Sequence, residues 1–306
     1  MHESELPILA RTLRGIEWIA RDEVSSRLCI GHIEQGHREL RFSAPLGPEL
    51  LALGTVDDVF VVVAEVDGVT RHRHSLARVR SLALDLDALA RLLGRSGPRT
   101  FDTTASFLGR RNYSRFELED ALAEAGGWNR VPRGGELSLR IHVVGSVATV
   151  AARVARVPLH RRAYRVATVP GSLHPPLARA LALLAASSFV DPFCGAGTIP
   201  IEGALAGLET AGTDRSSRAV AAARQNAAAA GVGVPFSVAD AAAVKGADCV
   251  VTNPPWGKAV PLAGPGLPDA RRLVLLTSER PRLANVVHRQ TVRVHGALAT
   301  ITVAES

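Results

Sequence analysis

From about residue 169 onward, short apolar runs alternate with stretches that have helical spacing. "SSFVDPF", "LETAGTD", "VPFSVAD" and "DCVVTNPP" have the length of buried strands, and the first three carry Asp191, Asp214 and Asp240 at their ends. "GTIPIEGALAG" and "SSRAVAAARQNAAAAG" have helical spacing. "RRLVLLTSE" predicts a fifth strand, and "TVRVHGALATITVAE" predicts a closing antiparallel hairpin. Strands separated by helices predict a parallel sheet with right-handed crossovers, so this half is α/β.

The pattern before residue 155 is of a different kind. "LRGIEWIARDEVSSRL" and "SLALDLDALARLL" predict helices, and "VDDVFVVVAEVDG" predicts a strand. "SRFELEDALAEAG" predicts a helix that opens with a capping box of Ser114 and Glu117. "ELSLRIHVVGSVATVAARV" alternates as two strands that turn at Gly145. These elements predict a separate α+β region, joined to the second half by a linker.

Length and composition indicate a folded, cytoplasmic protein of at least two domains. The chain has 306 residues and is 47% hydrophobic, and no run approaches the roughly 18 to 20 apolar residues of a membrane span. The N-terminus has no signal-peptide pattern. Cys29, Cys194 and Cys249 lie far apart without a CxxC, so they form neither a disulfide framework nor a zinc site. We therefore expect no metal and no membrane association.

Positive charge is unevenly distributed along the chain. The net charge is +7, and no acidic residue lies between Glu136 and Asp191, a stretch that contains seven arginines. "RHRHSLARVR" is a second stretch without acids. Such clusters either neutralise the phosphates of a nucleic acid or form solvated faces, and charge pattern alone leaves both open.

Polar residues at strand ends predict a ligand site, because ligands of parallel sheets bind beyond the carboxyl ends of the strands. "DPFCGAGT" places Gly195 and Gly197 in a strand-to-helix turn, where a helix N-terminus favours a carboxylate or a phosphate. Asp214 could accept the hydroxyls of a ribose or cap the next helix. Asp240 could meet an adenine amino group or serve as a turn residue. Together they favour a ligand that combines a nucleoside with a carboxylate.

The sequence "NPPW" after the fourth strand indicates chemistry on a planar amine. Asn253 Oδ1 and the Pro254 carbonyl could each accept one N–H of an exocyclic amine, which would draw its nitrogen towards a nucleophilic state. Trp256 offers a face for an unstacked base, worth about 1–3 kcal/mol. The alternative is a Pro-Pro turn with a buried tryptophan.

With these residues the C-terminal half resembles class I S-adenosylmethionine-dependent methyltransferases that carry a (D/N/S)PP(Y/F/W) motif. More narrowly, the chain resembles the THUMP-domain RNA guanine-N2 methyltransferases. The motifs that carry the resemblance are "DPFCGAGTIPIEGALAG", "GTDRSSRAVAAARQNAAAAG", "VVTNPPWG", "PLHRRAYRVATVPGSLHPPLARALALLA", "LRGIEWIARDEV" and "TFDTTASFLGRRNYSRFELEDALAEA". They cover nearly the whole chain. The resemblance implies a Rossmann-like methyltransferase domain with a mixed seven-stranded sheet, preceded by an α+β ferredoxin-like and THUMP region. The implied parts are a ferredoxin-like segment (1–55), a THUMP-like RNA-binding domain (56–155), a linker (156–172) and the methyltransferase domain (173–306).

The resemblance also implies roles for individual residues. S-adenosylmethionine would be bound by Leu173, Asp191, Gly195, Gly197, Thr198, Asp214, Asp240 and Asn253. The catalytic residues would be Asn253, Pro254 and Trp256. RNA would be bound by Arg110, Arg111, Arg115, Arg161, Arg162 and Arg165.

The function that this resemblance implies is transfer of a methyl group from S-adenosylmethionine to N2 of a guanine, with tRNA as the first expectation. The alternatives are a ribosomal RNA guanine-N2 methyltransferase, an adenine-N6 methyltransferase, and a non-catalytic RNA-binding protein that retains a cofactor pocket. The segment from Gly257 to Arg272 is shorter than in relatives and contains three prolines, which leaves substrate choice open.

Overall fold

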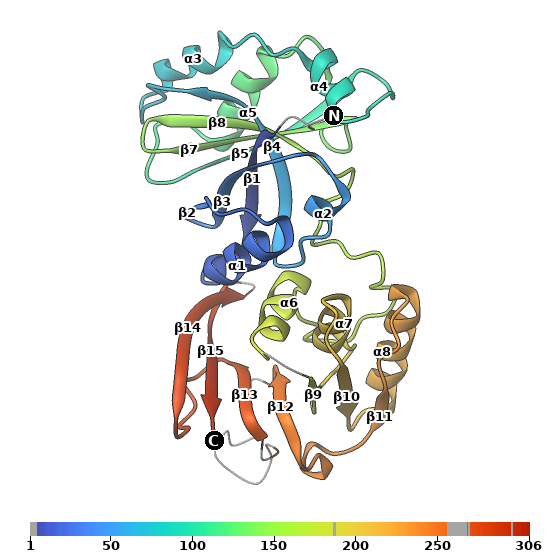
Figure 1. The fold of residues 1–306 in the computed structure, drawn as a ribbon. Coiled ribbons are helices and arrows are strands. Elements are labelled where there is room, and N and C mark those ends of the chain that lie inside the picture. The colour runs from blue at the N-terminus through green and yellow to red at the C-terminus, as the bar shows by residue number, and fades with distance from the viewer. Residues whose placement is uncertain (1–4, 186–187, 256–267, 269, 295) are drawn as a thin grey trace. The chain divides into compact units, whose positions relative to one another are not determined.

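The computed structural model describes residues 5–185, 188–255, 268, 270–294 and 296–306, and Figure 1 shows its helices and strands. The chain divides into two compact units. The first consists of Met1–Ala10, Arg41–Leu51 and Asp58–Pro158, and the second of Arg11–Leu40, Ala52–Asp57 and Leu159–Ser306. The predicted division at residues 55, 155 and 172 stays a prediction. Among the described residues, no helix combines the length and the apolar character needed to cross a membrane.

The first half of the chain supplies an eight-stranded sheet with the order β2-β3-β1-β4-β8-β7-β5-β6. Its strands are β1 (Leu6–Thr12), β2 (Glu34–Gly36), β3 (Glu39–Ala44), β4 (Val56–Val66), β5 (Thr100–Phe107), β6 (Asn129–Arg130), β7 (Leu137–Val144) and β8 (Val147–Arg153). The predicted antiparallel pair of β7 and β8 is confirmed. It turns at Gly145, whose φ of 59° is a conformation that glycine adopts without a Cβ clash.

Short helices accompany these strands, as the α+β prediction required. They are α2 (Pro48–Leu51), α3 (Ala77–Arg80), α4 (Leu86–Leu92) and α5 (Arg115–Glu124), with a 3₁₀ turn η1 (Arg73–Leu76). The capping box of α5 is confirmed, because Glu117 N donates to Ser114 Oγ at 3.2 Å and Ser114 N donates to Glu117 Oε2 at 2.9 Å. The helix predicted for "SLALDLDALARLL" begins only after Asp85, whose carboxylate accepts a hydrogen bond from Ala88 N at 2.8 Å and caps it.

The predicted mixed seven-stranded sheet is confirmed in the second unit, with the order β11-β10-β9-β12-β13-β15-β14. Its strands are β9 (Phe189–Asp191), β10 (Thr210–Asp214), β11 (Phe236–Val238), β12 (Ala247–Thr252), β13 (Ala270–Thr277), β14 (Val286–Val294) and β15 (Ala297–Glu305). Strands β9 to β13 pair in parallel, whereas β15 pairs antiparallel with both β13 and β14. The parallel strands therefore present their carboxyl ends at one edge.

Four α-helices complete the described part of the second unit: α1 (Glu17–Leu28), α6 (Pro175–Leu183), α7 (Thr198–Leu205) and α8 (Ser217–Ala230), with a 3₁₀ turn η2 (Ala241–Ala243). Figure 1 shows α6, α7 and α8 beside the strands β9 to β11. Although α1 comes from the N-terminal part of the chain, Ile16 and Ile19 share one core with Leu177 and Leu181 of α6 and Val292 of β14. Fully burying one such side chain contributes about 1.5–3 kcal/mol, so this core stabilises α1 within the second unit.

Candidate active site

A cavity of about 1020 Å³ lies at the carboxyl ends of the parallel strands. It is lined by residues from the ends of β9, β10 and β12, from the turn before η2 and from the segment Val169–Leu173. This is the edge at which the strand-end residues were predicted to meet. The predicted residues that line it are Leu173, Asp191, Gly195, Thr198, Asp214, Asp240, Asn253 and Pro254. The sequence analysis missed Arg215 and Arg218, two exposed cations that also line the cavity.

The two glycines of the turn after β9 have different surroundings. Gly195 has a φ of 52°, and a Cβ placed there would meet only Val169 Cγ2, at 3.6 Å. Its backbone is therefore open to a ligand. Gly197 does not line the cavity, and a Cβ there would lie 2.8 Å from the ring of Phe236 and 2.9 Å from Ala223 Cβ. For Gly197 the structure shows close packing of α7 against β11 and α8, and the predicted cofactor contact of Gly197 stays a prediction.

Asp214 holds the glycine turn. Its Oδ2 accepts a hydrogen bond from Gly195 N at 3.0 Å, and its Oδ1 accepts one from Ser216 N at 2.8 Å. The alternative that Asp214 caps α8 is excluded, because Ser216 is the N-cap and its Oγ accepts from Ala219 N at 3.3 Å. Asp214 thus connects the end of β10 to the turn after β9 while its side chain stays at the cavity.

Asp191 is the most deeply buried acid of the cavity wall, with 1% of its surface exposed. Its Oδ1 accepts hydrogen bonds from Thr252 Oγ1 at 2.6 Å and from Phe193 N at 3.0 Å. Burial raises the pKa of Asp191 to about 7, because a charged carboxylate loses its hydration there. Through Thr252 this side chain ties the end of β9 to the last residue of β12, next to Asn253.

The remaining predicted residues divide between described and undescribed parts of the chain. Asp240 lines the cavity and caps η2, since its Oδ1 accepts from Ala242 N at 3.0 Å. Asn253 and Pro254 follow β12 directly and line the same cavity. Trp256 lies outside the described residues, as does most of the short connection between β12 and β13.

The predicted RNA-binding arginines have unequal surroundings. In the first unit Arg110 and Arg115 are exposed, whereas Arg111 donates hydrogen bonds to the carbonyl oxygens of Val69, Leu108 and Gly145. The guanidinium of Arg111 therefore holds three loops together.

In the second unit Arg161 is exposed and Arg165 is half-buried. Arg162 departs from its predicted role. Its side chain is 14% exposed, and it donates to Glu202 Oε1 at 2.8 Å and to Gly54 O at 2.6 Å. A phosphate contact would require breaking this pair, so Arg162 is a structural residue.

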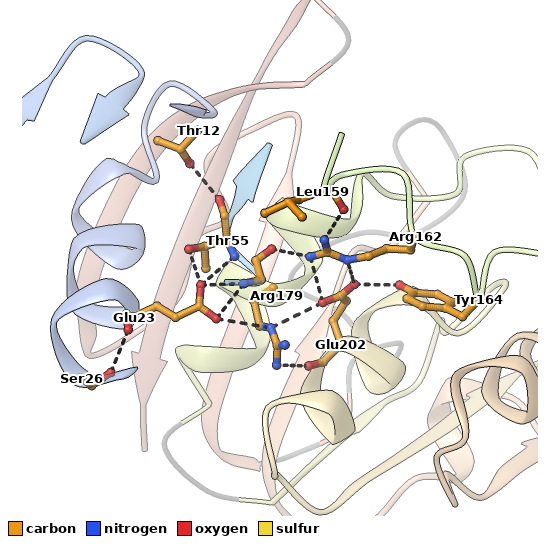
Figure 2. Close-up of polar contacts among 10 residues, drawn as sticks. Thr12, Glu23, Ser26, Thr55, Leu159, Arg162, Tyr164, Arg179 and Glu202 are labelled. Atoms are coloured by element: carbon orange, nitrogen blue, oxygen red, sulfur yellow. Dashed lines mark hydrogen bonds and ion pairs between the residues drawn. The ribbon is translucent and has the colours of Figure 1, made fainter. Parts of the chain in front are cut away.

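A buried network of acids and bases holds α7, the helix that begins at the glycine turn (Figure 2). Glu202 is fully buried, and its Oε1 accepts from Arg162 Nε and, at 2.9 Å, from the hydroxyl of Tyr164. Arg179 of α6 places its Nε 3.4 Å from Glu202 Oε2 and 3.6 Å from Oε1 of Glu23 in α1. Burial raises the pKa of Tyr164 and lowers that of Arg179. Two acids and two arginines thus share one interior site.

The sequence indicates this network through single charged residues in otherwise apolar helices, which an analysis of hydrophobic periodicity does not consider. Glu202 is the single charged residue of α7, "TIPIEGAL", and Arg179 is the single charged residue of α6, "PPLARALAL". Glutamate and arginine are almost never fully buried unless they are paired. A lone charge in an apolar helix therefore predicts a partner from elsewhere in the chain, although it does not identify that partner.

The second half of the chain is similar to known methyltransferases. Residues 162–264 match the family model described as "RMKL-like, methyltransferase domain". The ribosomal RNA large subunit methyltransferase K/L of Shewanella baltica (strain OS185) is 26% identical over 218 residues, which cover 52% of this chain and 31% of that relative. The tRNA (guanine(10)-N2)-dimethyltransferase of Methanothermobacter thermautotrophicus is 38% identical over 104 residues, which cover 31% of each. The chain thus spans about a third of the length of these curated relatives.

One solved structure aligns with nearly the whole chain. The crystal structure of TrmN from Thermus thermophilus has a TM-score of 0.79 and 26% sequence identity, and the match covers 98% of this chain and 99% of that one. The similarity therefore includes the α+β region as well as the mixed sheet.

Proposed function

Because residues 162–264 match the family model described as an RMKL-like methyltransferase domain, we propose that the protein is an S-adenosylmethionine-dependent RNA methyltransferase that acts on N2 of a guanine in tRNA. The observation that carries the proposal is that Asn253 and Pro254 line the same cavity as Gly195 and Asp214. One cavity thereby combines groups suited to an exocyclic amine with groups suited to a nucleoside. The names of the tRNA and ribosomal RNA methyltransferase relatives support RNA as the substrate class.

The cavity fits S-adenosylmethionine in size and in chemistry. Its volume of about 1020 Å³ is at the upper end of ligand pockets, which leaves room for a base beside the cofactor. Asp214 would accept the ribose hydroxyls, and Asp240 would meet the adenine amino group. The turn at Gly195 and the N-terminus of α7 at Thr198 suit the carboxylate of the methionine part. When bound, the cofactor supplies a methyl group on a positively charged sulfur.

The protein's own part in the reaction is to orient and polarise the target amine. Asn253 Oδ1 and the Pro254 carbonyl each accept one N–H of the guanine amino group. With both hydrogens held, the nitrogen lone pair is directed at the methyl carbon. The bound cofactor would supply the methyl group, and the part of this chain's residues is to hold the amine in position and accept hydrogen bonds from its two N–H groups. Positioning of this kind accounts for much of the barrier reduction in two-substrate reactions.

RNA would be held by arginines in both units, all of them exposed except the half-buried Arg165. Arg110 and Arg115 in the first unit, and Arg161 and Arg165 in the second, keep the role that the sequence analysis predicted. Each phosphate contact would make binding dependent on salt concentration.

The proposal is tested by comparing Asn253→Ala with wild type on bulk tRNA and on ribosomal RNA, with labelled cofactor and mass spectrometry of the nucleosides. We expect N2-methylguanosine in tRNA from the wild type and a loss of at least about 100-fold in Asn253→Ala, the size seen when one catalytic hydrogen-bonding group is removed. Gln225→Ala, which removes an exposed amide on α8, is the matched control and should keep full activity.

Each other result points to a defined alternative. N6-methyladenosine would overturn the guanine assignment, and label only in ribosomal RNA would overturn tRNA. Tight cofactor binding in calorimetry without transfer to any RNA would favour the non-catalytic RNA-binding protein. Full activity of Asn253→Ala would remove Asn253 from the mechanism.

A further inference from the structure

Two histidines and one carboxylate cluster in the second unit, outside the cavity. Asp57 lies near the start of β4, His160 lies in the segment between β8 and α6, and His174 is the residue before α6. All three are half-buried, and one potential ligand atom from each lies within 4.8 Å of the others. Although the cysteine spacing led us to expect no metal, we propose that Asp57, His160 and His174 bind a divalent cation of the zinc type. This site is independent of the proposed methyl transfer.

The hydrogen bonds of His160 leave its ring in the tautomer that a metal requires. Both its backbone N, at 2.9 Å, and its ring Nδ1, at 3.1 Å, bond to the carbonyl oxygen of Asp57. A carbonyl oxygen can only accept, so Nδ1 carries the hydrogen and donates it, which leaves Nε2 as the ring nitrogen that could bind a metal. Histidine ligands of metals are commonly oriented by such a bond from their other nitrogen to a backbone carbonyl.

The distance between Asp57 and His174 also suits a shared ion. His174 Nε2 lies 3.5 Å from Asp57 Oδ1. A charge-assisted hydrogen bond would be about 2.7–2.9 Å long, whereas two ligands about 2.1 Å from one tetrahedral ion lie about 3.4 Å apart. The rings of His160 and His174 are stacked with centroids 5.5 Å apart and an angle of 22° between them, so the two imidazoles lie next to each other.

The donor set selects the class of ion. Two imidazoles and one carboxylate are typical ligands of Zn²⁺ and similar borderline metals, whereas Mg²⁺ and Ca²⁺ prefer oxygen ligands only. Three protein ligands leave a fourth position for water. Arg38 NH2 lies 3.8 Å from the other carboxylate oxygen of Asp57, Oδ2, so a metal on Oδ1 would be bound by one oxygen only.

A metal here would stabilise a wall of the cavity. Ser172 and Leu173 line the cavity and directly precede His174, which is the N-cap residue of α6. Asp57 and His160 come from two distant parts of the sequence, so an ion on all three would cross-link both segments to the start of α6. Binding to the folded state alone raises the melting temperature in proportion to the logarithm of the metal concentration.

The test measures Zn²⁺ binding to the full chain without RNA or cofactor, after treatment with a chelator. Cys29 is an exposed thiol and could bind zinc by itself, so all proteins carry Cys29→Ser. Competition with a coloured chelator gives the stoichiometry and affinity, and thermal unfolding gives the melting temperature. We expect one Zn²⁺ per chain and a higher melting temperature with Zn²⁺ but not with Mg²⁺.

Two variants remove ligands while keeping the fold. His174→Asn places a residue that is tolerated at the N-cap position of α6, where His174 makes no capping hydrogen bond, and Asp57→Asn retains the shape of the side chain. Each should weaken Zn²⁺ binding by at least about 100-fold, since even a residue that only orients a ligand is worth about 10- to 100-fold. Their melting temperatures without metal should match that of the parent.

His32→Asn is the matched control. His32 Nε2 lies 3.8 Å from Glu34 Oε1, and its side chain is 89% exposed; within the described part of the chain this pair belongs to no group of three potential metal ligands. Its loss should leave Zn²⁺ binding unchanged. Absence of stoichiometric binding by the parent, or undiminished binding by both His174→Asn and Asp57→Asn, would overturn the site.

Discussion

The buried carboxyl of Asp191 predicts a specific dependence of stability on pH. Its pKa is about 7 in the folded protein, compared with an ordinary value of 3.8. Between these values the folded state holds more protons than the unfolded state, so stability decreases as the pH rises. The slope is at most about 1.4 kcal/mol per pH unit, and the whole window amounts to roughly 4 kcal/mol. Above pH 7 both states are ionised and this contribution is constant.

Asp191→Asn removes this titration without changing the shape of the side chain. Both hydrogen bonds to Asp191, from Thr252 Oγ1 and from Phe193 N, go to Oδ1, and the amide oxygen of asparagine can accept both. We therefore expect the variant to gain stability relative to wild type from pH 5 to pH 7, by up to about 1.4 kcal/mol per unit, and to keep a constant difference from pH 7 to pH 8.

The assay is urea unfolding of both proteins at pH 5, 6, 7 and 8 without ligand. Asp248→Asn is the control for loss of one negative charge, because Asp248 is an exposed residue whose Oδ1 lies 3.6 Å from Arg271 Nε. A difference between Asp191→Asn and wild type that is flat over this range, or that shrinks as the pH rises, would refute the argument from burial.

Three further substitutions test packing and polar contacts by urea denaturation. Glu202→Gln leaves two buried arginines short of a carboxylate and should cost about 3–5 kcal/mol; a loss below about 1 kcal/mol would mean that water replaces the partner. Gly212→Ala places a Cβ 2.7 Å from the ring of Phe236 and should cost about 1–3 kcal/mol; an unchanged midpoint would show that the ring moves freely. Ser114→Ala removes the capping hydroxyl of α5 and should cost about 1 kcal/mol; no change would indicate that another group caps the helix.

Much of the fold was readable from local patterns. The strands β9 to β13, the helices α7 and α8, and the closing hairpin of β14 and β15 follow from hydrophobic periodicity and from turn residues. The capping box of α5 was predicted because all its atoms come from residues three positions apart. The alternation of strands and helices predicted a parallel sheet, and the strand ends then predicted most of the cavity wall.

Other features depend on contacts between distant segments, which no local pattern encodes. From the sequence Asp214 could have bound a ribose or capped α8, and only the structure shows that Ser216 takes the cap and that Asp214 also holds the glycine turn. The family resemblance implied that Arg162 binds RNA, yet its partner Glu202 lies 40 positions further along the chain.

The sequence by itself thus determined the elements, their order and the chemistry of the strand ends, because backbone periodicity, capping and crossover rules act over a few residues or over whole strands. The tertiary structure alone decided the core that α1 shares with α6, the buried pairing of Glu23, Arg179 and Glu202, and the meeting of Asp57, His160 and His174. Each of these brings together side chains from separate segments. Their energies depend on burial and on distances of a few ångströms, which exist only after the chain has folded.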